Sequence, residues 1–256
     1  MKRLIVTADD VGLDRGMTEG AIRAHRDGVV TACSIVANGR AFDEAVEALR
    51  EVPSLEVGVH LTLVEERALT TGRTMPRSYV RFLLSRREVD VERELRAQIE
   101  KVLAAGLLPT HLNSHQHLHM LPRLFAMVTS LAQEFRIPFV RIAEDIGSAP
   151  PIRHIAVATL NRLGRRARRS VPEGLRTSGA TIGIFRAGSL DLRGARRLLY
   201  NIPDGVTEMI THPGIAVRGY DRWGYRWDEE TAVLCSEELR ASIDSLGIRL
   251  IAPSMA

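Results

Sequence analysis

The chain is poor in the residues that cross-link or anchor a protein. Its 256 residues include two cysteines, Cys33 and Cys235, which form no metal-binding spacing. We therefore expect no disulfide framework and a reducing compartment. The apolar runs fall short of the roughly 20 residues that span a bilayer, and Met1–Arg3 leads into too short an apolar stretch for a signal peptide. These absences predict a cytoplasmic protein without a transmembrane segment.

Linkers and repeats are also missing. No segment rich in proline, glycine and serine interrupts the chain, and no stretch repeats at a fixed period. The length lies within the range of a single α/β barrel. We therefore predict one domain over residues 1–256.

The net charge of +4 is concentrated in one basic run, Arg162–Arg169. Such a run can mark a surface that binds nucleic acid or another anionic partner. Elsewhere, however, both signs of charge interleave, and no aromatic pattern suited to stacking on bases is present. We therefore interpret the run as a solvated helix end and expect no nucleic-acid partner.

Short apolar segments alternate with amphipathic segments along the chain. This alternation predicts parallel βαβ units, and at this length the natural closure is a distorted TIM-like (βα) barrel, with a doubly wound open sheet as the alternative. Residues 64–80 and 213–228 lack a regular pattern and are expected to be loops over the active face. The expected strands are 4–8, 31–37, 55–63, 111–115, 139–143, 182–185, 206–211 and 248–252. The expected helices are 18–26, 41–52, 91–105, 121–135, 152–168, 190–200 and 229–246.

Polar side chains gather where four predicted strands end. In parallel α/β folds the functional site is assembled at the carboxyl edge of the strands, so these side chains are expected to meet there. The four places are Asp9-Asp10, His60, Asn113–His119 and His212.

The segment His111–His119 holds four of the eight histidines. His115 is nearest the end of the predicted strand and is the better candidate ligand. His117 and His119 lie beyond the strand and are expected to contact substrate or to support the ligands. A single histidine in an apolar strand, such as His60, is more often a hydrogen-bonded core residue than a ligand.

The adjacent carboxylates of Asp9 and Asp10 would point in opposite directions on a regular strand. One of them can then bind a metal while the other serves as a base, although Asp-Asp-Val-Gly could also be a plain turn. An Asp-His-His set leaves open positions on a divalent cation for water or a substrate carbonyl. Mixed nitrogen and oxygen ligation suits zinc, magnesium, manganese, cobalt or nickel, so ligand type does not settle the metal.

Five segments of the chain resemble, in their order, the motifs of the YdjC/ChbG carbohydrate deacetylases. The resemblance implies a distorted (βα) barrel related to polysaccharide deacetylases. It also implies metal-dependent removal of acetyl from an N-acetylated sugar. Segments 56–66 and 207–214 further resemble the branch associated with hopanoid biosynthesis, which would act on an N-acetylglucosaminyl hopanoid headgroup. The five segments are Thr7–Gly12, Val36–Gly39, Val57–Leu61, Pro109–His119 and Thr211–Gly214.

The resemblance also assigns roles. Asp10, His60 and His115 would bind one divalent metal ion, Asp9 would be the general base that activates the attacking water, and His212 would be an acid or an orienting group. Related enzymes suggest a homodimer. The residues expected to bind substrate or to support the ligands are Asn113, His117, His119 and Arg141.

One position departs from the family pattern. The family usually has aspartate immediately before Ser-His, and this chain has Asn113. An amide can still hydrogen-bond a neighbouring imidazole but brings no negative charge, so we expect a less basic ligand and weaker metal binding. Two other functions stay open at this point. They are another metal-dependent hydrolase on the same barrel, such as a phosphoesterase or an amidohydrolase, and a non-catalytic glycan-binding protein.

Overall fold

The computed structural model describes residues 1–84, 90–147 and 154–256 of the chain. In these ranges, eight parallel strands form one sheet with the order β5-β4-β3-β2-β1-β7-β6, and β8 pairs with β1 beside this path. The strands are β1 (Lys2–Val11), β2 (Ala32–Ile35), β3 (Glu56–Leu61), β4 (His111–Ser114), β5 (Phe139–Val140), β6 (Ala180–Ile182), β7 (Gly205–Thr211) and β8 (Arg249–Leu250).

The sheet curls into a distorted TIM-like barrel. From β1 to β5 the strands follow one another in sequence, without the reversal of order that defines a doubly wound sheet. The chain after β5 meets β6 through isolated contacts: Ile146 N donates to Thr181 O at 3.0 Å, and Thr181 N donates to Glu144 O at 3.0 Å. These few hydrogen bonds replace a continuous ladder, which is the distortion. The predicted fold class is therefore confirmed.

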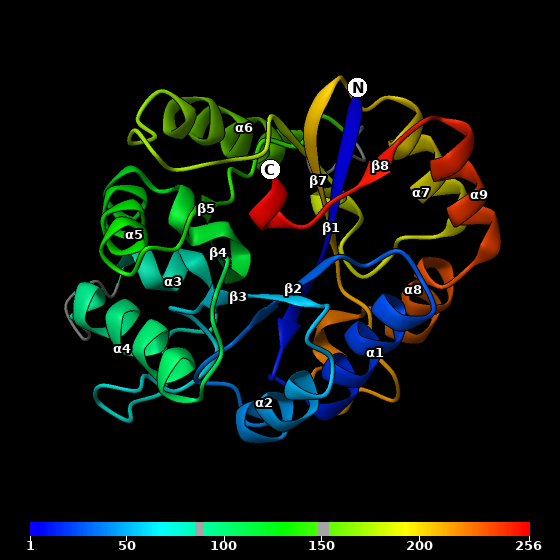
Figure 1. Cartoon of the computed structure of the whole chain (residues 1–256). Coiled ribbons are helices and arrows are strands. Elements are labelled where there is room, and N and C mark those ends of the chain that lie inside the picture. The colour runs from blue at the N-terminus through cyan, green and yellow to red at the C-terminus, as the bar shows by residue number, and fades with distance from the viewer. Residues whose placement is uncertain (85–89, 148–153) are drawn as a thin grey trace.

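Helices surround the strands (Figure 1). Several begin at an aspartate whose side chain accepts a backbone N–H of the first turn, as Asp14, Asp90 and Asp191 do. No helix in the described ranges is long and apolar enough to cross a membrane. The α-helices are α1 (Arg15–Arg26), α2 (Phe42–Arg50), α3 (Tyr79–Leu84), α4 (Val91–Ala104), α5 (Pro122–Glu134), α6 (His154–Arg168), α7 (Leu192–Tyr200), α8 (Trp227–Leu234) and α9 (Glu237–Ser245). Short 3₁₀ turns are η1 (His115–Met120), η3 (Ile184–Arg186), η4 (Asp221–Trp223) and η5 (Pro253–Met255).

Three expected elements differ from the structure. The single helix expected at 229–246 is two helices, α8 and α9, because the Ser236 side chain accepts the N–H of Leu239 and starts a new helix. The strand expected at 182–185 ends at Ile182, where Gly183, with φ of 97°, turns the chain into η3. Helix α3 lies partly in the expected loop 64–80. The expected helix 152–168 begins in residues 148–153, which lie outside the described ranges.

Alternate residues of the strands face the helices and the barrel interior. Leu4, Val6 and Ala8 of β1 belong to the large apolar cluster that includes helix residues. Ile5 belongs to a second cluster, and Thr7 and Asp9 continue the same face towards the carboxyl end of the strand. The barrel interior therefore has an apolar floor and polar layers above it, and the site lies in the upper layers. The floor consists of Ile5, Ala32, Phe139, Val206 and Ile251.

The features expected from composition can be located in the fold. Cys33 and Cys235 are both free, and Cys33 is buried. In the basic run, Arg168 donates to Glu144 Oε2 at 3.2 Å and to Ser178 O at 2.8 Å. Arg165 lies 3.7 Å from Glu144 Oε1. Part of the run therefore fastens the end of α6 to the barrel, while Arg165 itself stays exposed.

Two side chains of α8 hold the segment that follows β7. Glu230 Oε1 accepts the backbone N–H of His212 at 2.7 Å, and Thr231 Oγ1 accepts that of Gly214 at 2.8 Å. Burial raises the pKa of the Glu230 carboxyl to about 8, although hydrogen bonds from the backbone of His212, Leu190 and Gly188 partly oppose the shift. The position of His212 thus depends on a buried carboxyl group that holds its proton to an unusually high pH.

Replacing Glu230 by glutamine is expected to flatten the dependence of stability on pH. The folded state holds the Glu230 proton more tightly than the unfolded chain, whose glutamate pKa is about 4.5. The stabilisation is therefore fully present below pH 4.5 and is lost as the pH rises to about 8. Between these pH values, the wild type should lose roughly 1–4 kcal/mol of unfolding free energy relative to Glu230→Gln. Urea denaturation at a series of pH values measures this difference.

The exposed neighbour Glu229 supplies the control. Glu229→Gln should follow the wild-type curve within about 0.5 kcal/mol, because surface substitutions change stability little. The difference in unfolding free energy between the wild type and Glu230→Gln should change with pH. If it stays constant from pH 4.5 to 8, the pKa of Glu230 is not raised.

Candidate metal centre

Asp9 and Asp10 close β1 in an unusual backbone conformation. Asp10 has a left-handed φ of 67°, and the pairing of β1 with β2 shifts register between Ala8 and Val11. Asp9 Oδ1 lies 3.9 Å from Nδ1 of His60, and Asp10 Oδ1 lies 3.3 Å from Nε2 of the same ring. The two carboxylates were expected to point in opposite directions on a regular strand, and β1 is not regular at Asp10. The left-handed residue costs about 1–3 kcal/mol and lets both carboxylates face one imidazole.

Asp10, His60 and His115 converge at one point. Asp10 Oδ1 is 2.9 Å from His115 Nδ1 and 3.3 Å from His60 Nε2. One ligand atom from each residue lies within 4.8 Å of the other two, and all three residues are buried. The structure thus brings together the three residues that the sequence named as metal ligands, from β1, β3 and the start of η1.

Asn113 joins the metal centre to the candidate base. Its Oδ1 accepts the Nδ1 proton of His60 at 2.7 Å, which leaves Nε2 of that ring free to face Asp10. Its Nδ2 donates to Asp9 Oδ1 at 3.2 Å and to Ser34 Oγ at 2.8 Å. An aspartate at position 113 would place a second carboxylate beside Asp9, whereas the amide donates to Asp9 and still orients His60.

Asp9 is held by a dense set of donors. Arg141 Nη1 and Nη2 donate to its two oxygens at 2.5 and 2.9 Å, and Ser34 Oγ donates to Oδ1 at 2.8 Å. Burial by itself would raise the pKa of Asp9, but the Arg141 guanidinium and the His60 ring outweigh burial and hold that pKa well below its ordinary value. In the described part of the chain, Oδ2 accepts only from Arg141, so this oxygen keeps a lone pair for another donor.

Arg141 is fully buried and supports the site from inside the barrel. Besides Asp9, it donates through Nε and Nη2 to Glu208 Oε1 at 2.9 and 2.8 Å. Thr7 Oγ1 donates to the same oxygen at 2.8 Å. With no exposed surface, Arg141 positions Asp9. Of its two expected roles, support of the ligands fits this placement and substrate contact does not.

His115 lies between two carboxylates and beneath an indole ring. Its Nδ1 faces Asp10, its Nε2 lies 3.1 Å from Glu65 Oε2, and the Trp223 ring stacks on it at 5.3 Å. Burial disfavours a charge on His115, but the carboxylates of Asp10 and Glu65 outweigh burial and raise the pKa of His115 to about 10. A metal at Nδ1 must therefore displace a proton.

The other histidines of the tract take different positions. His119 accepts from Ser114 Oγ at 2.6 Å and donates to Arg141 O at 3.0 Å, so it fastens the backbone of Arg141. Burial lowers the pKa of His119 to about 3, which keeps it neutral. His111 is buried against Gly58, where a Cβ atom would lie 2.4 Å from its ring. His117, at a φ of 53°, is only partly buried.

His212 faces the centre from the end of β7. Its Nε2 lies 3.9 Å from Asp10 Oδ2, and its ring meets Tyr225 edge-on at 5.4 Å. Burial lowers the pKa of His212, which favours the neutral imidazole. The side chain is therefore within reach of a group bound at Asp10.

Sequence reasoning missed several residues of this arrangement, among them Glu208, Glu65 and Trp223. Glu208 carried a signal, because a charged residue inside the apolar strand β7 needs a buried partner. Glu65 lies in segment 56–66, in which the resemblance assigned a role to His60 alone, and Trp223 lies in an irregular segment without a motif. The assignment of residues 64–80 and 213–228 to the active face was the one pointer to them.

The donor set suits a divalent cation. Both candidate histidine ligands hydrogen-bond through their other nitrogen, His60 to Asn113 and His115 to Glu65, as metal-ligating histidines do. The carboxylates of Asp9 and Asp10 both face His60, and a cation bound at Asp10 would offset their charge. The nature of the metal is left open by an Asp-His-His set.

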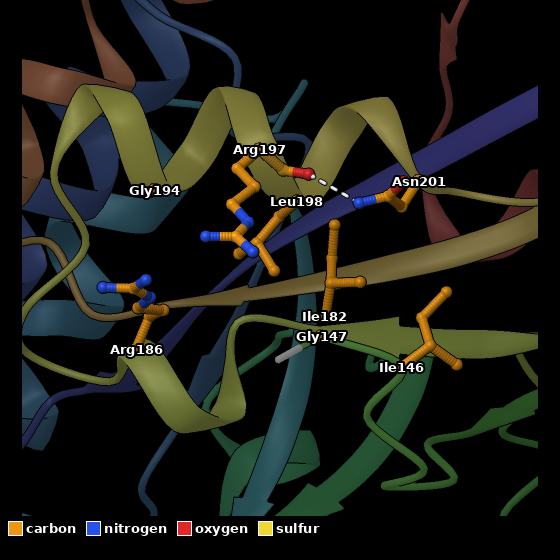
Figure 2. Close-up of a pocket in the computed structure, with 8 residues that line it drawn as sticks. All are labelled: Ile146, Gly147, Ile182, Arg186, Gly194, Arg197, Leu198 and Asn201. Carbon is orange, nitrogen blue, oxygen red and sulfur yellow. Dashed lines mark hydrogen bonds between the residues drawn. The ribbon is translucent and has the colours of Figure 1, made fainter. Parts of the chain in front are cut away.

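A separate cavity of about 220 Å³ lies beside α7. Figure 2 shows Arg186 and Arg197 reaching towards it, with Asn201 donating to the carbonyl oxygen of Arg197. Ile182 and Leu198 supply apolar lining. None of the candidate metal ligands lines this cavity, so the metal centre and the cavity are distinct features.

Relatives of the chain carry a consistent description. It is 31% identical over 260 residues to the carbohydrate deacetylase of Brevibacillus brevis, covering 97% of each chain. It is 30% identical over 257 residues to the carbohydrate deacetylase of Geobacillus stearothermophilus, covering 96% of this chain and 95% of the relative.

Solved structures agree with the fold. A candidate cellobiose-phosphate cleavage protein from Enterococcus faecalis V583 superposes with a TM-score of 0.76 and 25% identity, covering 99% of this chain and 98% of the other. A peptidoglycan N-acetylglucosamine deacetylase superposes with a TM-score of 0.52 at 12% identity, covering 99% and 87%, which shows a shared fold. The sequence model of the YdjC-like proteins matches residues 3–245. As the motifs predicted, the chain belongs to the YdjC-like protein family.

Proposed function

We propose that this protein is a metal-dependent carbohydrate deacetylase that hydrolyses the amide of an N-acetylated sugar to acetate and a free amino sugar. One observation carries the proposal: Asp10, His60 and His115 converge within 4.8 Å, with the charged carboxylate of Asp9 next to them. Two relatives that match nearly the whole chain are carbohydrate deacetylases, which supports the substrate class.

The metal would be held by Asp10 Oδ1, His60 Nε2 and His115 Nδ1. A divalent cation bound there would polarise the acetyl carbonyl and lower the pKa of water. Asn113 fixes the tautomer of His60, so that the nitrogen facing Asp10 carries a lone pair. The three side chains need little rearrangement, because buried neighbours already fix their positions.

Asp9 is the proposed general base. Its depressed pKa keeps it ionised at neutral pH, and Arg141 fixes the direction of its carboxylate. The free lone pair on Oδ2 can accept the proton of the attacking water. A strongly depressed pKa makes the carboxylate a weak base in water. The reaction therefore needs water whose own pKa has been lowered at the adjacent metal centre.

His212 is proposed to orient the reacting amide and, in its protonated form, to donate a proton to the leaving nitrogen; its lowered pKa makes the protonated form the minor one at neutral pH. It faces Asp10 from β7, on the end of the barrel where Glu230 fixes its backbone. Trp223 and Tyr225 lie against His115 and His212, and such aromatic faces suit the apolar face of a sugar ring. The sugar is proposed to be N-acetylglucosaminyl, in an oligosaccharide or on a hopanoid glycolipid.

The decisive measurement is mass spectrometry of N-acetylglucosaminyl oligosaccharide and hopanoid substrates after incubation with the protein. The reactions contain magnesium, zinc, manganese, cobalt or nickel. We expect loss of one acetyl group with stoichiometric acetate, abolished by a chelator. His115→Ala should lose both bound metal and turnover. Release of phosphate from phosphoesters instead would favour a phosphoesterase, and tight glycan binding without turnover in any metal would favour a binding protein.

Asp9→Asn is expected to separate chemistry from metal binding. The amide has nearly the same shape but cannot accept the proton, so turnover should fall by about 10²–10⁴-fold. Bound metal, measured by elemental analysis, should stay near the wild-type level, because Asp10, His60 and His115 are unchanged. Asp43→Asn, on the exposed face of α2, is the control and should behave as the wild type. Retained turnover in Asp9→Asn would remove Asp9 from the role of base.

A further inference from the structure

Glu65 lies on the side of His115 that faces away from the metal ligands. Its Oε2 is 3.1 Å from His115 Nε2, while His115 Nδ1 is 2.9 Å from Asp10 Oδ1. The Glu65 side chain is 8% exposed, although the residue belongs to an irregular segment. The two nitrogens of one ring thus point at two different carboxylates, one at the metal centre and one outside it.

We propose that Glu65 is a positioning residue for His115, an inference that rests on the proposed metal-dependent function. Its carboxylate accepts the Nε2 proton and so presents the Nδ1 lone pair to the metal. A neutral imidazole carries its proton on one nitrogen, and the partner of that nitrogen decides which one binds a metal. Glu65 thereby does for His115 what Asn113 does for His60.

Glu65 is itself held in place by several contacts. Its Oε1 lies 3.3 Å from Arg222 Nη2, and its backbone N–H donates to Pro76 O at 2.9 Å. Its φ of 71° is unfavourable for a glutamate, so the surrounding contacts must impose it. The neighbouring Glu66 accepts the hydroxyl proton of Tyr220 at 2.9 Å.

These contacts join two segments above the metal centre. Glu65 and Glu66 belong to the segment after β3, whereas Arg222 and Trp223 belong to the segment after β7. The Trp223 ring stacks on His115 with a 27° angle between the rings. Glu65 thus meets His115 and Arg222 with its two oxygens. The orientation of the His115 ring is set by a carboxylate at its edge and an indole on its face.

Glu65 differs from a metal ligand by its placement. Within the described ranges, the group of ligand atoms that lie within 4.8 Å of one another contains Asp10, His60 and His115 and leaves Glu65 outside. The oxygens of Glu65 are already engaged by His115 and Arg222. A carboxylate in this position tunes the ligand without entering the coordination sphere.

The test compares Glu65→Gln with Glu65→Leu. The glutamine amide oxygen can still accept the Nε2 proton, whereas leucine cannot. Isothermal titration of the metal-free full-length protein with zinc should show affinity weakened about 10–100-fold in Glu65→Leu and largely restored in Glu65→Gln. The control is Asp43→Asn, which changes an exposed carboxylate on α2 that has no part in these contacts and should bind zinc as the wild type does.

A spectroscopic measurement supplies an independent readout. In ¹⁵N-histidine NMR of the zinc-loaded wild type, His115 should carry its proton on Nε2 and the metal on Nδ1. In Glu65→Leu the Nε2 proton should exchange rapidly with water. A metal bound to Nε2 in the wild type would overturn the proposal. In the cobalt-loaded proteins, an absorption spectrum of Glu65→Gln that shows one oxygen ligand fewer than the wild type would also overturn it, because Glu65 would then be a ligand.

The outcomes separate this inference from the proposed function. A wild type that binds zinc at His115 Nδ1 but releases no acetate from any N-acetylated sugar would overturn the deacetylase proposal alone. Equal zinc affinities of the wild type and Glu65→Leu would overturn the role of Glu65 alone. A folded Glu65→Leu variant, shown by an unchanged circular dichroism spectrum, makes the comparison valid.

Discussion

The site depends on one buried cation, the guanidinium of Arg141. It lies in the barrel interior between the carboxylates of Asp9 and Glu208, and so connects the chain that follows β5 to β1 and β7. Burying these charges is unfavourable unless each finds its partners, and removing one partner of such a pair costs about 3–5 kcal/mol. Arg141 meets this condition with four donated hydrogen bonds. Because the guanidinium cannot lose its charge, Asp9 stays ionised in an interior that would otherwise protonate it.

The rest of the site follows from the alternation of side chains along the strands. Residues on the inner face pass from an apolar floor at Ile5 to the threonine at position 7 and the carboxylate at position 9. Polar side chains from β2, from β4 and from the residue after β5 point into the same layer of the barrel interior, so Ser34, Asn113 and Arg141 all reach Asp9. The metal centre is built one step further out, where β1 bends at Asp10. The polar layer therefore fixes the orientation of the ligands before any cation binds.

The sequence predicted the barrel and the three proposed ligands because both follow from local patterns. Apolar periodicity revealed most strands and helices, and ligand-type residues at strand ends are brought together by any parallel sheet. Glu65 and Trp223 could not be found this way, since their positions depend on how two irregular segments cross above the barrel. The break at Ser236 was missed for a related reason: the apolar pattern continues through it, and one side-chain hydrogen bond decides the boundary. Asn113, which looked like a weakened family motif, has a physical role that only its neighbour Asp9 explains.

The left-handed backbone of Asp10 has a consequence for how this centre can be changed. The residue is a proposed ligand, and its positive φ also turns the end of β1 so that the carboxylate faces His60 and His115. Aspartate, asparagine and glycine tolerate a positive φ, and most other residues do so poorly. An alanine scan at this position would therefore combine a lost carboxylate with a redirected chain end, and its result would overstate the contribution of the carboxylate. Few amino acids both bind a metal and tolerate a positive φ. Few substitutions at position 10 can therefore change the ligand without also changing the course of the backbone.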